Sequence, residues 1–359
     1  MAPRRTLTLM LCAITGASLV ATAVPSSAAP GFTISPLRTS DSIQSTSGFV
    51  VHLKDRSASA QRVRTAHAAS AMQATSTSLR GSVDRAAKVR GAHVTESLAR
   101  ANNSMSVQVS QGLNATAAKA FASEIERNPE VESVEPVLHM TINENTGVHP
   151  AAVSSAPNDQ YWNRQWGLNS KNGIDAPGAW TTNTGSGVTV AVIDSGITKH
   201  PDLDGKVLPG YDFISDRYTA GDGNGRDLDP SDEGDWTRAG ACTRRDVPSS
   251  WHGTHVAGII GAATNNARGV AGAAPGAKIL PVRALGHCGG TDVDIADGIT
   301  WASGGEVPGV PTNHNPAKVI NLSLGGPSNY CPITYQRAID AAVSRGSTVV
   351  VAAGNEAMD

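Results

Sequence analysis

Short, uninterrupted apolar runs rich in β-branched residues dominate the C-terminal half of the chain. They read GVTVAVIDSG, GAKILPVRAL, KVINLSLGG and STVVVAAGN, and they begin at residues 187, 276, 318 and 347. Runs of this kind are typical of strands that are buried on both faces. Segments of helical length lie between them, at residues 251–263, 291–303 and 333–345. The alternation predicts an α/β fold, a doubly wound parallel sheet with flanking helices.

A smaller region with a different pattern comes first, between residues 48 and 143. Residues 48–55 and 103–113 alternate between apolar and polar positions, which predicts strands. Residues 75–92 are polar enough for a surface helix. The region is therefore predicted to be a separate, small α+β domain.

The end of this region carries clear boundary signals. Asn114 is the predicted N-cap of a second helix, in which Phe121 and Ile125 face inward at a spacing of four, and a strand follows that helix. Residues 144–156 then lose all periodicity. They predict a linker and processing region, because exposed segments without structure are the preferred sites of proteolytic cutting.

The first residues have the features of an export signal. Two arginines precede an apolar run at residues 7–24, and small residues suited to a signal peptidase follow at Ser27 and Ala29. A membrane-spanning helix is the alternative, but polar residues interrupt the run, and it falls short of the ~20 apolar residues of a comfortable span. We predict a signal peptide at residues 1–29, a secreted, extracellular protein, and no stable membrane association once the signal is removed.

Charge and cysteine content limit the possible binding partners of the protein and the compartment in which it resides. The 29 basic and 31 acidic side chains nearly balance, so nothing predicts a nucleic-acid partner. Cys12 leaves with the signal, and Cys242, Cys288 and Cys331 remain in a compartment where thiols tend to be oxidised. Three pairings of these cysteines are open. Our hypothesis pairs Cys242 with Cys288 and leaves Cys331 for a cysteine further downstream.

Polar residues stand where the predicted strands end. Asp194 ends the first strand, His252 lies in the first turn of the next helix, and Asn355 follows the fourth strand. A buried aspartate that fixes a histidine tautomer is the orienting half of nucleophilic catalysis, and an amide donor can stabilise an oxyanion. Each residue alone is most often a turn or cap residue. His252 and His255 are a conceivable zinc pair, but they lack the spacing of the hydrolytic zinc helix.

Several longer motifs resemble one family. VAVIDSGI, HGTHVAG and VVVAAGNE are similar to the aspartate, histidine and oxyanion-asparagine motifs of the subtilisin-like serine proteases, in the order of that family. NLSLGG resembles the strand against which those enzymes pair the substrate backbone. The resemblance covers most of residues 157–359, and residues 48–143 look similar to the inhibitory propeptide of the family.

The resemblance implies a role for each matching residue. Asp194 would orient His252, which would act as general base and then general acid, and Asn355 would help to form the oxyanion hole. The residues that would bind the substrate main chain or line its primary pocket are Ser323, Leu324, Gly325 and Gly354.

The nucleophile of the family lies in a Gly-Thr-Ser motif, which does not occur in these 359 residues. We therefore expect the catalytic domain at residues 157–359 to be C-terminally incomplete and the chain, as given, to be an inactive fragment. The resemblance implies a secreted serine endopeptidase that acts on proteins or peptides, is made as a zymogen, and uses its own propeptide as inhibitor and folding aid. A monomer is the default expectation. The alternatives are a non-catalytic, peptide-binding pseudoprotease and a zinc hydrolase.

Calcium is the expected structural cofactor. Clustered carboxylates in a glycine-containing loop suit this ion, and residues 222–235 hold several of them, although a solvated loop without an ion is equally compatible with the spacing. The candidate ligands there are Asp222, Asp227, Asp229 and Asp232, with Asn224, Glu233 and Asp235 nearby. The resemblance implies a second site at Asp202 and Asn266. Asp159 is a third, weaker candidate.

Overall fold

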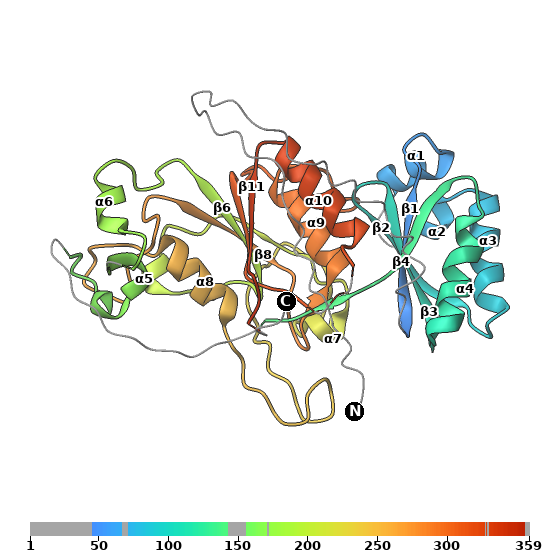
Figure 1. The fold of residues 1–359 in the computed structure, drawn as a ribbon, viewed down its shortest axis with the longest axis horizontal. Coiled ribbons are helices and arrows are strands. Elements are labelled where there is room, and N and C mark those ends of the chain that lie inside the picture. The colour runs from blue at the N-terminus through green and yellow to red at the C-terminus, as the bar shows by residue number, and fades with distance from the viewer. Residues whose placement is uncertain are drawn as a thin grey trace, which may run out of the picture.

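A computed structural model describes residues 45–66, 71–142, 156–170, 172–326, 328 and 330–355. The predicted signal peptide and almost all of the predicted linker lie outside the described residues. The described parts form two domains, each with its own sheet, and the N-terminal domain lies to one side of the C-terminal domain (Figure 1). No helix among the described residues is long and apolar enough to cross a membrane.

The N-terminal domain is a four-stranded antiparallel sheet covered by helices. The strand order is β2-β3-β1-β4, with β1 at Thr46–Leu53, β2 at Val94–Arg100, β3 at Ser104–Leu113 and β4 at Val131–Pro136. The helices are α1 at Ala58–Thr65, α2 at Ala71–Ala74, α3 at Thr77–Lys88 and α4 at Ala115–Glu126. The sequence pattern predicted β1, α3, β3, α4 and β4. The elements α1, α2 and the edge strand β2 were not predicted, and the polar, partly exposed residues of β2 carry no clear alternation.

The boundary signals of α4 act as predicted. The side chain of Asn114 accepts a hydrogen bond from the backbone N–H of Ala117, which caps the helix. Phe121 and Ile125 are fully buried, and the ring of Phe121 lies 4.4 Å from that of Phe49 on β1. These side chains therefore fix the helix against the sheet.

The C-terminal domain is built on a parallel sheet of five strands in the order β11-β10-β6-β8-β7. The bounds are β6 Thr189–Asp194, β7 Tyr211–Asp212, β8 Lys278–Arg283, β10 Val319–Leu322 and β11 Thr348–Val351. The long helices are α8 His252–Gly261, α9 Asp292–Ala302 and α10 Ile333–Ser344. Each predicted apolar run contains one of these strands, and each predicted helical segment contains one of these helices. Of the five strands and three helices, the short edge strand β7 was not predicted.

Burial on both faces explains why the strands read as continuous apolar runs. On β6, Val192 packs with Val256 of α8 on one face of the sheet. Its neighbours Ala191 and Ile193 belong to the core shared with Ile295 and other residues of α9 on the opposite face. Helices thus cover both faces, with α8 on one side and α9 and α10 on the other (Figure 1). The predicted doubly wound arrangement is confirmed.

The remaining elements are too short to give a periodic signal. They are β5 at His139–Met140, β9 at Gly290–Thr291, the 3-10 helices Trp162–Arg164 and Pro201–Leu203, α5 at Trp166–Asn169, α6 at Ala176–Trp180 and α7 at Arg217–Ala220.

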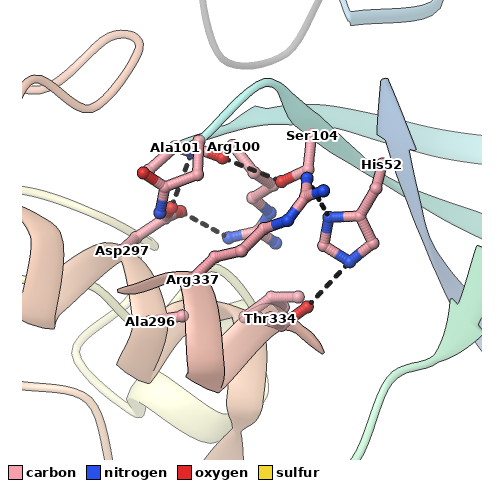
Figure 2. A pocket seen from close by; sticks show the side chains of 10 residues that line it. His52, Arg100, Ala101, Ser104, Ala296, Asp297, Thr334 and Arg337 are labelled. Atoms are coloured by element: carbon pink, nitrogen blue, oxygen red, sulfur yellow. Dashed lines mark hydrogen bonds and ion pairs between the residues drawn. The ribbon is translucent and has the colours of Figure 1, made fainter. Parts of the chain in front are cut away.

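The N-terminal domain contacts the C-terminal domain through β5 and the ends of β2 and β4. The C-terminal elements that it contacts are β9, α9, α10 and the segment at Gly325. β5 pairs antiparallel with β9, and Thr141 exchanges two backbone hydrogen bonds with Gly325, of 2.8 and 3.2 Å. Residues 139–141 therefore lie as a strand between two segments of the C-terminal domain. Glu135 accepts the first N–H groups of α10, from Ile333 and Thr334, at 3.0 and 2.8 Å. Arg100 and Ala101 contact Asp297 of α9 (Figure 2).

We predict that Phe121→Ala destabilises the N-terminal domain by about 3–5 kcal/mol, because truncating a buried aromatic ring removes burial and leaves a cavity. Native-state hydrogen exchange of the β1 and β3 amides measures this change. Val89→Ala is the control, since Val89 is 81% exposed. Equal exchange rates in the two variants would contradict the prediction.

Candidate active site

The end of β6 and the start of α8 bring Asp194 and His252 together. Both carboxylate oxygens of Asp194 lie within hydrogen-bond distance of His252 Nδ1, at 2.8 and 2.9 Å. Asp194 is fully buried, and the side chain of His252 is 15% exposed. The backbone N–H of Ser195 donates a second hydrogen bond to Oδ1 of Asp194, at 2.7 Å. The contact fixes the imidazole with Nδ1 toward the carboxylate.

A glycine allows α8 to approach β6 this closely. A β-carbon at Gly253 would lie 2.3 Å from the carbonyl oxygen of Gly196 and 3.2 Å from Cβ of Asp194. The N–H of Gly253 donates to Oγ of Ser195 at 3.0 Å. Trp251, directly before the histidine, has a left-handed backbone with φ of 54°, an unusual conformation for a bulky residue. The sharp entry into the helix therefore places His252 over the strand end.

Residues 222–235, called the acidic loop below, supply two carboxylates that support this arrangement. This role was not predicted from the sequence. Asp232 accepts a 2.7 Å hydrogen bond from Oγ of Ser195, the hydroxyl that receives the N–H of Gly253. Asp235 accepts the backbone N–H and the hydroxyl of Ser250, at 2.6 and 2.8 Å. Oγ of Ser250 in turn accepts the N–H of His252, at 3.2 Å. The signal was present as acidic residues shortly before the histidine, but their partners depend on the path of the loop.

The structure does not bring the predicted calcium ligands of the acidic loop together. Each is engaged elsewhere: Asp222 with Arg283, Asp227 with Asn224, Asp229 with Ser231 and Asp232 with Ser195. Across the described part of the chain, no three His, Cys, Asp or Glu side chains lie close enough to hold a metal ion. Asp227 and Asp229 shape the loop through local hydrogen bonds, and Asp222 and Asp232 attach it to the sheet side of the domain through Arg283 and Ser195.

The two residues of the second predicted site contact each other, and the third candidate, Asp159, binds the same loop. Asp202 Oδ1 accepts the side-chain amide of Asn266 at 2.7 Å, and Asp159 accepts the backbone N–H groups of Asn265 and Asn266, at 2.9 and 3.4 Å. Asp159 and Asp202 are buried. Hydrogen bonds thus link three distant segments, with Asp159 and Asp202 as acceptors. Carboxylate oxygens of this kind are ligands that calcium prefers.

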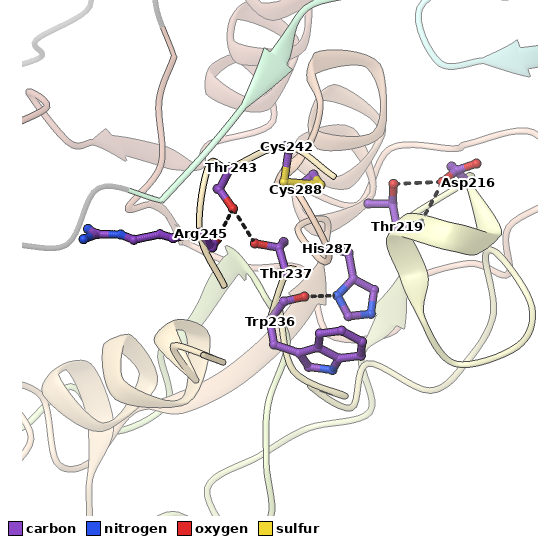
Figure 3. The surroundings of a disulfide bond; sticks show 9 residues. All are labelled: Asp216, Thr219, Trp236, Thr237, Cys242, Thr243, Arg245, His287 and Cys288. Atoms are coloured by element: carbon purple, nitrogen blue, oxygen red, sulfur yellow. Dashed lines mark hydrogen bonds between the residues drawn. A yellow bond between two sulfur atoms is a disulfide. The ribbon is translucent and has the colours of Figure 1, made fainter. Parts of the chain in front are cut away.

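A disulfide joins the segment between the acidic loop and α8 to the segment that follows β8. Cys242 and Cys288 are bonded, with Cα atoms 5.7 Å apart (Figure 3). Beside the bridge, His287 Nδ1 lies 2.5 Å from the carbonyl oxygen of Trp236, and the two rings meet edge to face with centroids 4.7 Å apart. The hypothesis that Cys242 pairs with Cys288 is confirmed.

The other predicted site residues follow the carboxyl ends of neighbouring strands. Ser323, Leu324 and Gly325 come directly after β10, and Gly354 and Asn355 come after β11. Gly354 has φ of 86°, which glycine adopts at no steric cost, and Asn355 is exposed. Because β11, β10 and β6 are adjacent and parallel, these residues lie at the same edge of the sheet as Asp194.

Comparisons with known proteins agree with this geometry. The profile of the subtilase family matches residues 185–359. Residues 185–359 belong to the subtilase family. An extracellular protease of Xanthomonas campestris pv. campestris is 51% identical over 257 residues, which are 70% of this chain and 42% of that protein. The chain thus spans less than half the length of this relative.

Two solved structures share the fold of the subtilase domain. A protease of Pseudoalteromonas arctica has 55% sequence identity and a TM-score of 0.55, over 56% of this chain and 60% of that chain. Fervidolysin from Fervidobacterium pennivorans, described as a keratinolytic enzyme related to subtilisin, has 25% identity and a TM-score of 0.56. That match covers 89% of this chain and 41% of that chain.

One carboxyl group of the subtilase domain titrates far from its ordinary range. Asp292, at the start of α9, accepts the backbone N–H of Leu138 at 3.0 Å and is fully buried. Its second oxygen has no hydrogen-bond partner among the described residues. Burial raises the pKa of the Asp292 carboxyl to about 8, and the charge of Glu135 adds to this shift.

We predict that Asp292 lowers the stability of the folded chain as the pH rises. The folded chain keeps the proton up to about pH 8, whereas an unfolded aspartate loses it near its ordinary pKa of 3.8. Folding therefore takes up a proton between these values, and stability falls across this window. Between pH 5 and pH 8, the free energy of unfolding should fall by about 2–4 kcal/mol relative to Asp292→Asn, as measured by urea denaturation.

Asp204→Asn is the matched control, because Asp204 is exposed and its removal should leave the pH profile unchanged. A constant offset between the wild type and Asp292→Asn across this pH range would show that Asp292 ionises normally.

Proposed function

We propose that the chain is part of a secreted serine endopeptidase that hydrolyses peptide bonds of proteins and is made as a self-inhibited zymogen. The observation that carries the proposal is the buried contact of Asp194 with His252 Nδ1, at 2.8 Å, in a domain of the subtilase family. A buried carboxylate in this position holds the imidazole in one tautomer and stabilises the imidazolium that forms during the reaction.

The proposed mechanism assigns one step to each group. His252, through Nε2, takes the proton of a serine hydroxyl as that oxygen attacks the substrate carbonyl, and it later gives the proton to the leaving amine. Asp194 stays ionised throughout. The side-chain amide of Asn355 donates to the oxyanion of the tetrahedral intermediate. The family motif of the serine is not among these 359 residues, and we propose that it is supplied by a segment beyond residue 359.

The pairing of the N-terminal domain supports the zymogen proposal. Residues 139–141 occupy a slot between β9 and Gly325, with backbone hydrogen bonds on both sides. An extended substrate would bind the same edges by strand addition, with Ser323, Leu324 and Gly325 on one side and Gly354 in the wall of the primary pocket. The N-terminal domain would therefore exclude substrate until it is released, and it would template the folding of the domain on which it lies.

The same slot supports a second candidate function. A non-catalytic, peptide-binding protein would use the Gly325 edge in the same way and would need no serine.

The proposal for the endopeptidase also includes secretion and a monomeric state. The name of the Xanthomonas relative supports an extracellular location, and the disulfide fits an oxidising compartment.

Calcium is proposed as a structural cofactor at Asp159, Asp202 and Asn266. Hydrogen bonds already link these three segments, and a bound cation would replace the one that Asn266 donates to Asp202. Calcium held by these residues would supply charge that fixes surface segments and would take no part in the reaction.

Activity of the natural gene product tests the proposed function. Asp194→Asn should lower kcat for a peptide substrate by about 10⁴-fold, because the imidazole loses its tautomer, and His252→Ala should lower it at least as much. A fluorophosphonate probe should label the wild type and react far more slowly with both variants.

His255→Ala is the control, because His255 lies on the same helix but is exposed. Full activity of this variant is expected for the proposed mechanism. Loss of activity on replacing His255, together with one zinc ion per chain, would establish a zinc hydrolase. A natural product that binds peptides and reacts with no probe would establish the peptide-binding alternative.

Calcium should stabilise the chain by mass action. For a site with a Kd near 10⁻⁴ M, 10 mM calcium adds about 2.7 kcal/mol and raises Tm by roughly 5–10 °C over the value in chelator. Asp202→Asn should abolish this shift in differential scanning calorimetry, and Asp229→Asn should retain it. The reverse pattern would place the ion in the acidic loop, and equal Tm values with and without calcium would disprove the site.

A further inference from the structure

The N-terminal domain contributes an arginine to a buried cluster on the subtilase domain. Nη1 of Arg100, the last residue of β2, lies 2.7 Å from Asp294 Oδ1 and 3.3 Å from Asp297 Oδ2. All three side chains are at most 5% exposed. The next residue adds a contact, because the backbone N–H of Ala101 donates to Asp297 Oδ1 at 2.8 Å (Figure 2).

Among the described residues, the subtilase domain supplies one positive charge to this cluster. Arg226 binds the same two carboxylates, at 2.7 and 2.8 Å. Burial alone would raise the pKa of Asp294, but Arg100 and Arg226 outweigh it and lower that pKa to about 2. The two carboxylates are thus balanced by two guanidinium groups, one from each domain.

We propose that Asp294 and Asp297 form an arginine-recognition site on α9, whose ligand is the Arg100–Ala101 corner of the N-terminal domain. The site binds a guanidinium group together with the backbone N–H of the residue that follows the arginine. It thereby controls how tightly the released N-terminal domain stays bound as an inhibitor, and to that extent the inference rests on the proposed function.

The contacts of the guanidinium group explain why arginine fits and lysine does not. Besides Nη1, which meets the two carboxylates, Nε donates to Oγ of Ser106 at 2.8 Å and Nη2 reaches Oγ of Ser215 at 3.4 Å. All three nitrogens of the fork therefore have a partner in a buried place. A lysine ammonium is a single point charge and leaves some of these acceptors without a donor.

Loss of Arg100 is expected to weaken the interface far more than loss of an exposed pair. Without it, two buried carboxylates share the single charge of Arg226, and an uncompensated buried charge is strongly destabilising. The same interface holds an exposed pair of Arg337 and Glu132, whose side chains are 25% and 47% exposed. Pairs of this kind contribute little because water screens them.

The test uses the chain from residue 30 onward, with a site-specific protease sequence inserted in the predicted linker and an affinity tag at the C-terminus. Cutting the linker leaves the N-terminal domain held by its contacts alone. The measured quantity is its rate of release from the immobilised C-terminal piece. Arg100→Ala should accelerate release by roughly 30-fold or more, and Arg100→Lys by at least about 10-fold. Glu132→Ala, the matched control, should change it by less than about 3-fold.

A double-variant comparison localises the effect. In an Asp297→Asn background, Arg100→Ala should accelerate release by much less than in the wild type, because its partner is already altered. Equal effects in the two backgrounds would place the role of Arg100 elsewhere. Release of Arg100→Lys at the wild-type rate would overturn the arginine-recognition site, and this variant decides the matter if Arg100→Ala does not fold.

Release of the N-terminal domain requires no catalysis. A natural gene product without peptidase activity would therefore refute the proposed function and leave these release rates as they are. Release rates independent of Arg100 would refute the recognition site and leave the proposed function intact.

Discussion

The burial of one carboxylate constrains most of the C-terminal domain. Asp194 ends a strand that is covered on both faces, so its charge is removed from water and needs donors close by. Those donors are Nδ1 of His252 and the N–H of Ser195. To bring His252 there, α8 has to approach β6 through Gly253, and Trp251 has to take a left-handed backbone. The acidic loop then supports the same helix through Asp232 and Asp235.

Electrostatics also shape the contact between the two domains, but in two different ways. Arg100 meets ionised carboxylates of α9, so that charge on one domain matches charge on the other. The carboxyl group of Asp292, the first residue of the same helix, accepts a backbone N–H of the N-terminal domain, and its burial favours the neutral form. The first turn of α9 therefore holds two carboxyl groups of opposite preference, because burial favours the protonated form of Asp292 and the arginines favour the charged form of Asp294.

The parts of the structure that sequence reasoning predicted are those that carry a repeated local signal. Continuous apolar runs gave the strands β6, β8, β10 and β11, and the cap at Asn114 gave the start of α4. Asp194 and His252 were found because both stand at element boundaries and belong to longer motifs. The edge strand β2 and the two-residue strands β5, β7 and β9 carry no such pattern, since their pairing depends on segments distant in sequence.

The hydrogen-bond and ion-pair partners of loop side chains could not be predicted from local sequence patterns either. The spacing of the acidic residues at 222–235 was equally compatible with a calcium site and with a loop without an ion. In the structure these carboxylates bind four separate partners, among them Ser195 and Arg283. Composition indicates that charge is present, but only the path of the backbone decides where each carboxylate points. For the same reason the Arg100 cluster left no signal in the sequence, because its members lie up to 197 residues apart.

The bond between Cys242 and Cys288 encloses a particular stretch of chain. The two cysteines are 46 residues apart in sequence, and the segment between them contains the whole of α8 and β8. A single break of the backbone anywhere inside this covalent loop would leave both new ends attached to the same molecule. A cut of the backbone near the histidine-bearing helix α8 would therefore not separate the two pieces.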